Sequence, residues 1–473
     1  MKKYLRILTI ILCGLLSFFV VSCGKKDDNS GTNNGGSTTK TVYLTYAEWG
    51  DQDVAQAMLD AFMEKHPNIK VTLDTSITGS GTAFTQSLVE HAQANMLPDV
   101  FVTDNVPTVI NNGLVYDISS LWDNDADAQL VYENIAETAV YYDNTLKKNV
   151  RLAAPSYQFL KCFFVNTTLL NNLGLDLPEY DWTFEDFYSI SKAVQNQGSF
   201  GGNRIFAING YYGALDFEKA MTAQSSSGLG YDSWDGEKFN YTSEEWIAWR
   251  NKTREFYDTG LLEQLTEEEK QELYGSTDAW PFEKGHTAFA VEGSWNFITM
   301  LDQFQASGID VEVYPYPAGE EAHQAVILDY MCVSALTDFP EEAFELLKWM
   351  SFGRDGWAAR LNIMKDSQKG LDRFPVADYS EIWTDITEYM TELGETHNYE
   401  GYIYCIENLS NGAPDVDKWL PGYSDFWNYV YETDETEDWY NKSTDQLARE
   451  WMALINQFVT EAYTKLGLSP YQK

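Results

Sequence analysis

Apolar positions in residues 41–102 follow two periods in turn. β-Prone runs with alternating or continuous apolar residues are each followed by a stretch in which apolar residues recur every three or four positions, as Val54, Met58 and Phe62 do. Alternating short strands and amphipathic helices of about 12–15 residues are typical of βαβ units, which form a parallel sheet. The predicted order is strand 41–47, helix 53–66, strand 69–73, helix 82–95 and strand 98–102.

A second α/β unit is predicted after residues 151–155. Thr183 with Asp186 three residues later resembles a helix-capping pair, and Phe187, Ile190 and Val194 then form one apolar face. The further predicted elements are strands 161–165 and 287–291 and helices 169–173, from Thr183, 294–301, from Pro340 and 444–466. The fold class predicted from this pattern is α/β.

Polar and aromatic residues follow the first and third predicted strands. Glu48, Trp49 and Asp51 come directly after strand 41–47, and Asp104 comes after strand 98–102. In an open parallel sheet, ligands bind outside the carboxyl ends of the strands. The pattern therefore predicts a binding site that includes Trp49, Asp51 and Asp104.

The first 40 residues have the features of a targeting segment. Basic residues precede an apolar run of about 15 residues, which is shorter than the ~20 needed to span a bilayer. The sequence VVSC at 20–23 resembles a bacterial lipobox, and a Gly-, Ser- and Asn-rich tether follows. We expect a signal peptide at 1–22, a lipid on Cys23 and a tether at 23–40, with a retained membrane anchor as the alternative. The protein would then be exported and held on the outer face of the bacterial cell membrane.

The charge balance excludes one class of partner. The chain of 473 residues carries 72 acidic and 32 basic residues, a formal net charge of −40. Such an excess repels phosphate backbones and anionic headgroups, so nucleic acid is not expected as a partner. Aromatic residues make up 15% of the chain, which is more than the core of an α/β protein requires.

Metal and cofactor motifs are not found in the sequence. The five histidines are isolated, and Cys162, Cys332 and Cys405 have no zinc-ligand spacing. Buried free thiols are expected for these three, with one disulfide between two of them as the alternative. Asp123, Asp125 and Asp127 alternate as in a calcium loop, but Ala128 and Asn134 replace its glycine and its glutamate, so a solvated acidic loop is expected. No metal and no cofactor are predicted.

Ten short motifs follow one another along the chain. They are EWG at 48–50, HPNIKV at 66–71, LPDVF at 97–101, AAPSY at 153–157, FFVN at 163–166, WTFEDF at 182–187, FEKGHTAF at 282–289, GSW at 293–295, PYP at 315–317 and PEEAF at 340–344. No single motif is diagnostic, but their common order resembles one family, the sugar-type extracellular solute-binding proteins of ABC importers, which are maltose-binding-protein-like. Val165 stands where relatives usually have Tyr, which removes one hydroxyl from the site.

The resemblance implies a two-lobed fold, each lobe a sheet flanked by helices, with the ligand in the cleft between them. Lobe I would comprise 41–151 and 318–370, and lobe II 152–317 and 371–473. The crossings near 151–155 and 314–317 would act as the hinge. The resemblance further implies a monomer that delivers its ligand to the permease subunits of an ABC transporter.

A carbohydrate ligand needs aromatic faces for its C–H surfaces and carboxylates that accept from its hydroxyls. The resemblance assigns a stacking role to Trp295 and Trp427, because both match motifs in which relatives place such a ring. Tyr157 follows the first crossing, and Tyr211 and Tyr212 form a glycine-flanked aromatic pair. The predicted ligand-binding residues are thus Trp49, Asp51, Asp104, Tyr157, Tyr211, Tyr212, Trp295 and Trp427. Core packing is the alternative for each aromatic residue, and a solvated cap for each acid.

The predicted function is capture of a carbohydrate, expected to be an oligosaccharide, without catalysis. One alternative is a secreted glycoside hydrolase, which requires two carboxylates about 5–10 Å apart. A chain with 72 acidic residues always contains candidate pairs, so the number of acids does not distinguish a hydrolase from a binding protein. Another is a binding protein for a cationic solute such as a polyamine, which would also favour acidic and aromatic walls. A purely adhesive surface lipoprotein is the third.

Overall fold

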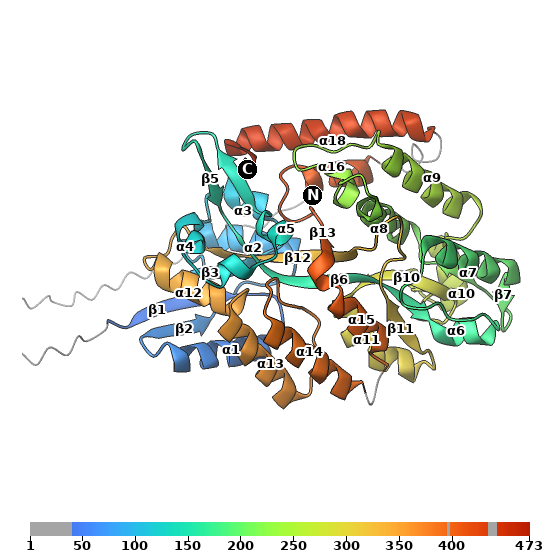
Figure 1. Cartoon of the computed structure of the whole chain (residues 1–473), viewed down its shortest axis with the longest axis horizontal. Helices are drawn as coiled ribbons and strands as arrows, with labels where there is room; N and C mark the ends of the chain where they lie inside the picture. Colours follow the sequence, from blue (N-terminus) through green and yellow to red (C-terminus); the bar gives the residue numbers. More distant parts are fainter. Residues whose placement is uncertain (1–39, 395–397, 434–441) are drawn as a thin grey trace, which may run out of the picture. The chain divides into compact units, whose positions relative to one another are not determined.

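A nine-stranded mixed sheet connects the two parts of the chain that the sequence pattern separates (Figure 1). The computed structural model describes residues 40–394, 398–433 and 442–473, and Thr41–Lys473 form one unit. The predicted signal peptide at 1–22, Cys23 and the tether lie outside the described residues. The main path of the sheet has the order β2-β1-β3-β12-β6-β10-β9.

The first part of the sheet confirms the predicted βαβ units. β1 (Val42–Ala47) pairs in parallel with β2 (Ile69–Leu73) and with β3 (Val100–Thr103). The intervening helices are α1 (Gln52–Lys65) and α2 (Thr82–Gln93). The apolar face predicted for the first helix is buried, since Val54, Met58 and Phe62 are at most 8% exposed.

Two long antiparallel strands lie at the centre of the sheet. β6 (Ala154–Asn166) pairs along its first half with β12 (Gln324–Val333), and β12 also pairs with β3. The second half of β6 pairs with β10 (Thr287–Gly293) and with β11 (Val311–Tyr314). β6 therefore passes from one part of the sheet into the other. The strand predicted at 161–165 is only its second half.

The second part of the sheet ends at β9 (Phe206–Ile208), which is parallel to β10. The predicted cap at Thr183 is confirmed, because its hydroxyl and the Asp186 carboxylate form a reciprocal capping box. The helices of this part are α6 (Thr167–Asn172), α7 (Phe184–Gln197), α8 (Tyr211–Met221), α9 (Glu244–Asp258), α10 (Glu267–Tyr274) and α11 (Ser294–Ala306).

The C-terminal region packs against both parts. α18 (Thr444–Leu466) has the bounds that its apolar period predicts, and it contacts α9 and α16 (Figure 1). β14 (Leu468–Pro470) then pairs with β4 (Val140–Asp143), which pairs with β5 (Lys148–Arg151). Residues predicted to belong to different lobes thus share one small sheet, and the lobe boundaries stay predictions. The other helices here are α12 (Pro340–Met350), α13 (Arg354–Ser367), α14 (Ser380–Leu393), α15 (Glu400–Glu407) and α16 (Tyr423–Glu432).

Short elements complete the described chain. β13 (Gly412–Pro414) extends the sheet beside the first residues of β12, parallel to them. The others are α3 (Val106–Asn111), α4 (Ser119–Asp123), α5 (Glu133–Ala136), the hairpin β7 (Ser199–Phe200) and β8 (Asn203–Arg204), and 3₁₀ turns η1 (Ala128–Leu130), η2 (Thr222–Gln224), η3 (Tyr231–Ser233) and η4 (Leu409–Asn411).

The predicted state of the cysteines is confirmed, since Cys162, Cys332 and Cys405 are buried free thiols. The acidic loop is less solvated than predicted: the Asp125 carboxylate is 11% exposed and pairs with Lys348 at 2.8 Å. Within the described ranges, no cluster of three or more His, Cys, Asp or Glu is arranged to hold a metal ion. In the same ranges, every helix is too short or too polar to span a bilayer.

Candidate ligand-binding site

Asp51 and Lys369 join the end of β1 to the segment 369–373. One Asp51 oxygen caps α1 by accepting from the backbone N–H groups of Asp53 and Val54. The other oxygen accepts from the Lys369 ammonium, which lowers the pKa of Asp51 and raises that of Lys369. Both side chains are close to half exposed, so this pair lies at the edge of the site.

Arg373 continues this contact inward. Its guanidinium lies 4.9 Å from the ring of Tyr157 and 5.4 Å from that of Phe159. It is also beside the end of β1, since a Cβ added at Gly50 would lie 3.3 Å from its Nη2. Burial alone would lower the pKa of Arg373, but the carboxylates of Asp372 and Glu48 raise it well above its usual value. The buried cation is therefore balanced by two anions.

Trp295 approaches the same segment from the other part of the sheet. It is the second residue of α11, is partly buried, and packs edge-on against Phe159 with ring centroids 5.6 Å apart. The preceding Ser294 hydroxyl donates to the Asp372 carbonyl at 2.5 Å. The indole of Trp295 lies over Gly293, where an added Cβ would be 2.2 Å from the ring. Glycine at 293 is therefore required for this position of the ring, because any larger residue would displace the indole.

Segment 369–373 is contacted by Asp51 and by the chain neighbours of the two tryptophans: Gly50 follows Trp49 and lies beside Arg373, and Ser294 precedes Trp295 and donates to Asp372. Trp49 is partly buried and packs edge-on against Phe84 at 5.2 Å. The structure thus places near one segment two residues predicted after the first strand, Trp49 and Asp51, and Trp295, which the resemblance assigns to the site. The Arg373 guanidinium lies 5.4 Å from the ring of Phe159, on which Trp295 packs, and beside Gly50, the residue that follows Trp49.

Asp104 lies in an adjoining cluster of charges. Its carboxylate accepts from the hydroxyls of Thr82 and Thr85. Burial alone would lower the pKa of Lys418, but the carboxylates of Asp329 and Asp415, with a smaller contribution from Asp104, raise it above its usual value. Lys418 pairs with Asp329, which is opposite Tyr157 in the β6–β12 register. The cluster therefore extends from the end of β3 to the centre of the sheet.

The cluster reaches the second part of the sheet through Lys161. The Lys161 ammonium pairs with Asp216 at 3.3 Å and donates to the Tyr231 hydroxyl at 2.9 Å. Asp415 is 1% exposed, and burial together with the neighbouring Asp417 raises its pKa. Burial likewise raises the pKa of Glu292. Carboxylates outnumber ammonium groups here, which makes the region unfavourable for an anionic ligand.

Tyr157 is brought to this region but is covered by protein. Its side chain is 1% exposed, its hydroxyl donates to the Met350 carbonyl, and it accepts from Arg360 at 2.9 Å. In this structure Tyr157 packs beside the Arg373 guanidinium under a cover of protein, and direct contact with a ligand stays a prediction. Tyr211 and Tyr212 are the first residues of α8, and their side chains lie outside the described part of the chain.

Trp427 belongs to a different environment. It is 6% exposed in α16, and the Lys219 ammonium lies 3.8 Å from the centroid of its ring. It packs edge-on against Trp451 of α18 at 5.5 Å. Its neighbour Tyr423 donates at 2.8 Å to the buried Asp232 carboxylate. Stacking of a ligand on Trp427 stays a prediction.

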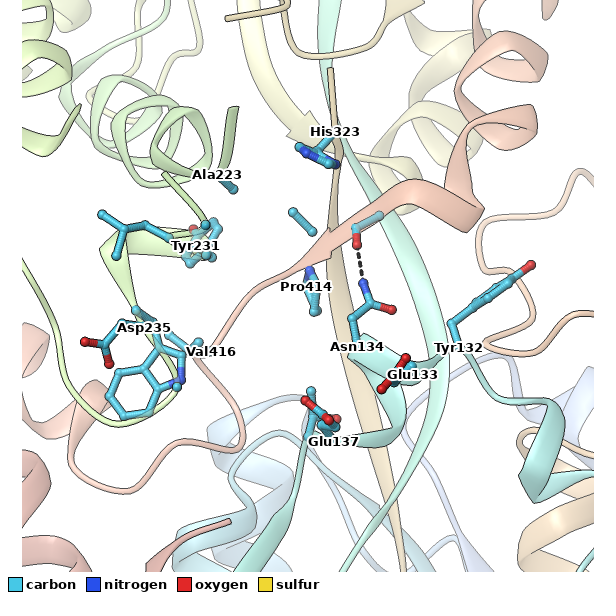
Figure 2. Close-up of a pocket in the computed structure, with 18 of the residues that line it drawn as sticks. Tyr132, Glu133, Asn134, Glu137, Ala223, Tyr231, Asp235, His323, Pro414 and Val416 are labelled. Atoms are coloured by element: carbon cyan, nitrogen blue, oxygen red, sulfur yellow. Dashed lines mark hydrogen bonds between the residues drawn. The ribbon is translucent and has the colours of Figure 1, made fainter. Parts of the chain in front are cut away.

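A cavity of about 950 Å³ lies between α5, residues 223–236 and the C-terminal residues (Figure 2). Among the predicted residues whose side chains are described, none lines it. Tyr231 lines the cavity and is also the hydroxyl that Lys161 donates to. The residues at the strand ends, rather than this cavity, form the candidate site, because they combine partly exposed rings with carboxylates from both parts of the sheet.

The cations of the site are not among the residues predicted from the sequence. Lys161 could have been noticed as a lone lysine within an apolar strand, a pattern that favours a buried partner. Phe159 could be placed only once the full length of β6 was known. Lys369 and Lys418 carry no sequence signal, because their partners Asp51 and Asp329 are more than 80 residues away in the chain. Arg373 pairs with the adjacent Asp372, but its position beside Gly50 joins distant parts of the chain.

The arrangement is suited to a neutral, polar ligand. Four ion pairs neutralise the cations, while the indoles of Trp49 and Trp295 offer apolar surface. The carboxylates of Asp104 and Asp216 offer acceptors to a ligand that donates hydrogen bonds. Such a site favours a solute that has both hydroxyl groups and an apolar face.

Comparison with known proteins agrees with this architecture. Residues 46–352 match the family model described as bacterial extracellular solute-binding protein. A cyclic alpha-maltosyl-1,6-maltose binding protein from Arthrobacter globiformis has a TM-score of 0.65 at 16% identity, covering 89% of this chain and 100% of that chain. None of the curated proteins matches the chain.

Two further solved structures are similar. An ABC substrate-binding protein from Listeria monocytogenes in complex with cycloalternan has a TM-score of 0.61 at 18% identity, covering 88% of this chain and 99% of that chain. The GacH receptor of Streptomyces glaucescens, described in complex with acarbose, has a TM-score of 0.61 at 14% identity, covering 89% and 99%. The fold is accordingly the two-lobed α/β fold of these proteins.

Proposed function

Because the chain belongs to the bacterial extracellular solute-binding protein family, we propose that it captures a carbohydrate and delivers it to an ABC transporter permease. The observation that carries the proposal is Trp295, a partly buried indole at the start of α11, where Ser294 contacts segment 369–373, the segment that also pairs with Asp51. The three similar structures described above are named for cycloalternan, a cyclic maltosyl-maltose and acarbose, which supports a carbohydrate ligand.

The ligand we propose is a neutral oligosaccharide. The two indoles would pack on the C–H faces of the sugar rings, and the carboxylates of Asp51, Asp104 and Asp216 would accept from hydroxyls. The excess of carboxylates over cations disfavours uronates and phosphorylated sugars. Ligand contact with both lobes would favour the closed state, because only that state makes both sets of contacts.

Export and anchoring form a second part of the proposal. The basic and apolar segment at 1–22 would direct export, and a diacyl group on Cys23 would hold the protein, as a monomer, at the outer face of the cell membrane. This position would keep the binding domain near the permease. Labelling with a palmitate analogue of wild type and Cys23→Ser tests it: incorporation that survives the substitution contradicts the proposal.

Calorimetry of Thr41–Lys473 against a panel of oligosaccharides, with product analysis, tests the function. We expect stoichiometric binding of at least one sugar, without turnover. Ligand at 100 times its Kd should stabilise the domain by about 2.7 kcal/mol. Cleaved products would indicate a glycoside hydrolase instead. If no sugar binds or raises the melting temperature, the carbohydrate assignment is wrong.

A further inference from the structure

The cavity of about 950 Å³ has no role in the site described above. Its walls come from α5, from residues 223–236, from His323, from residues 412–416 and from the C-terminal residues (Figure 2). Pro414 and Val416 line it, whereas Asp415 between them belongs to the charge cluster of the candidate site. Adjacent residues of one segment thus contribute to two different sites.

Aromatic residues line this cavity from several directions. Tyr231 lies on the wall opposite α5, and the other rings come from both earlier and later parts of the chain (Figure 2). Their burial ranges from Tyr231, which is 2% exposed, to Tyr471, which is 36% exposed, so rings lie both in the wall and at the opening. The rings that line the cavity are those of Tyr132, Tyr231, Trp234, Trp419, Tyr463 and Tyr471.

The charged groups of the cavity are mostly carboxylates. Glu133 and Glu137 of the α5 region lie on one side, and Asp235 lies on the other (Figure 2). Glu137 pairs with Lys473 at 2.7 Å, whereas Glu133 and Asp235 make no ion pair within the described residues. Lys473 is the one lysine or arginine among the residues that line the cavity, and it is already neutralised. Phosphate or carboxylate ligands therefore have little to bind here.

We infer that this cavity is a second carbohydrate site, separate from the one at the strand ends. Rings, carboxylates and the Asn134 amide together match the C–H faces and hydroxyls of a sugar. The volume is within the range of about 300–1,000 Å³ that small-molecule sites occupy, which suits a short oligosaccharide. The ligand class rests on the proposed function, whereas the location rests on the cavity alone.

Two substitutions at the edge of the cavity can test the inference without disturbing the core. Glu133 and Tyr471 are both exposed, so Glu133→Ala and Tyr471→Ala should fold normally, which circular dichroism would check. Glu268→Ala on the exposed helix α10 is the matched control for loss of a carboxylate. Trp295→Ala reports on the site at the strand ends. The probes are maltotetraose, cellotetraose and mannotetraose, each titrated to millimolar concentration by calorimetry and by protein-observed NMR.

We expect two saturable events with at least one probe. Removing a carboxylate that accepts from a sugar should weaken one event about tenfold, and removing the Tyr471 ring should weaken the same event. Trp295→Ala should weaken the other event, and Glu268→Ala neither. A single event that disappears in Trp295→Ala and is unchanged in the cavity variants overturns this inference and leaves the proposed function intact.

The remaining outcomes are also decisive. If one event is seen and only the cavity variants remove it, the cavity is a carbohydrate site and the strand ends are not. If no probe binds to any variant or to wild type, the carbohydrate function fails, and the second site fails with it.

Discussion

Trp295 and Trp427 are both tryptophans for which the family resemblance implies the same stacking role, and they occupy opposite kinds of surroundings. Trp295 is partly exposed at the start of α11, with one edge on Phe159 and its indole over Gly293. Trp427 is 6% exposed, with the Lys219 ammonium 3.8 Å from the centroid of its ring and Trp451 at its side.

The comparison shows that a ring's role depends on what covers its faces. A ring face covered by a cation is already engaged in a favourable interaction, which a ligand would have to replace. The ring of Trp295 instead retains surface that a ligand can cover at little cost. We therefore expect substitution of Trp427 to affect mainly stability and substitution of Trp295 to affect mainly binding.

The largest effect is expected for Trp427→Ala. Removing this buried ring leaves a cavity between α16 and α18 and also removes the cation–π contact of Lys219. Truncation of a buried tryptophan costs about 3–5 kcal/mol of unfolding free energy. Urea unfolding of Thr41–Lys473 measures it. A loss below about 1 kcal/mol would show that Trp427 is not a core residue.

Asp232, in the same surroundings, is expected to make stability depend on pH. It is 1% exposed, accepts from Tyr241 and Tyr423, and burial raises its pKa from 3.8 to about 7. The folded protein therefore holds this proton more tightly than the unfolded chain between pH 4 and pH 7. Stability should fall as the pH rises through this range, by up to about 4 kcal/mol.

The matched pair Asp232→Asn and Asp235→Asn tests this. Asp232→Asn should flatten the decline of the melting temperature between pH 4 and pH 7, because the neutral amide does not titrate. Asp235→Asn, at an exposed turn, should retain the wild-type decline. Equal slopes in wild type and Asp232→Asn would mean that Asp232 is ionised throughout.

Trp295→Ala is expected to weaken binding of the cognate sugar at least tenfold, since buried aromatic anchors at binding sites contribute about 2 kcal/mol or more. The melting temperature without ligand should change little, because the ring is partly exposed. Trp249→Ala, which removes another partly buried indole that packs on Phe184, is the control and should leave affinity unchanged. Unchanged affinity in Trp295→Ala removes this residue from the site.

The smallest effect is expected at the exposed pair of Asp51 and Lys369. Lys369→Ala should cost less than about 1 kcal/mol, because both side chains are near half exposed and salt screens the pair. Asp51→Ala should cost about 1 kcal/mol, because it also removes the cap of α1. Since Lys369 lowers the pKa of Asp51, the pair stabilises the fold at neutral pH and this contribution is lost as the pH falls below about 4. Thermal unfolding at two salt concentrations distinguishes the two effects: a salt-independent loss in Lys369→Ala would contradict screening.

Local sequence patterns predicted the elements that are defined by interactions between residues close together in the chain. The strands and helices of 41–102, the capping box at Thr183 and the bounds of α18 follow from apolar period and cap chemistry, and the structure confirms them. The first half of β6 was missed because it contains Pro155 and the polar residues Ser156 and Gln158, which do not favour a central buried strand, although the structure buries all three. β12 was missed because its residues are buried on both faces, so apolar residues do not alternate with exposed polar ones there.

The site was predicted less completely than the fold. Positions after strands 41–47 and 98–102 located Trp49, Asp51 and Asp104, because strand ends can be inferred from sequence. Their cationic partners and the contact of Lys219 with Trp427 join residues far apart in the chain, and no local pattern encodes such pairs. The ligand contacts of the eight predicted residues stay predictions.

The buried thiols have a practical consequence for observing closure. Burial raises the pKa of Cys162, Cys332 and Cys405, so each should remain protonated and inaccessible to maleimides at neutral pH. A chain that starts at Thr41 also lacks Cys13 and Cys23. Two cysteines introduced on exposed helices of opposite lobes could therefore carry a donor and an acceptor dye without removing any native residue. The protein is thus ready for conversion into a fluorescent reporter of its own ligand.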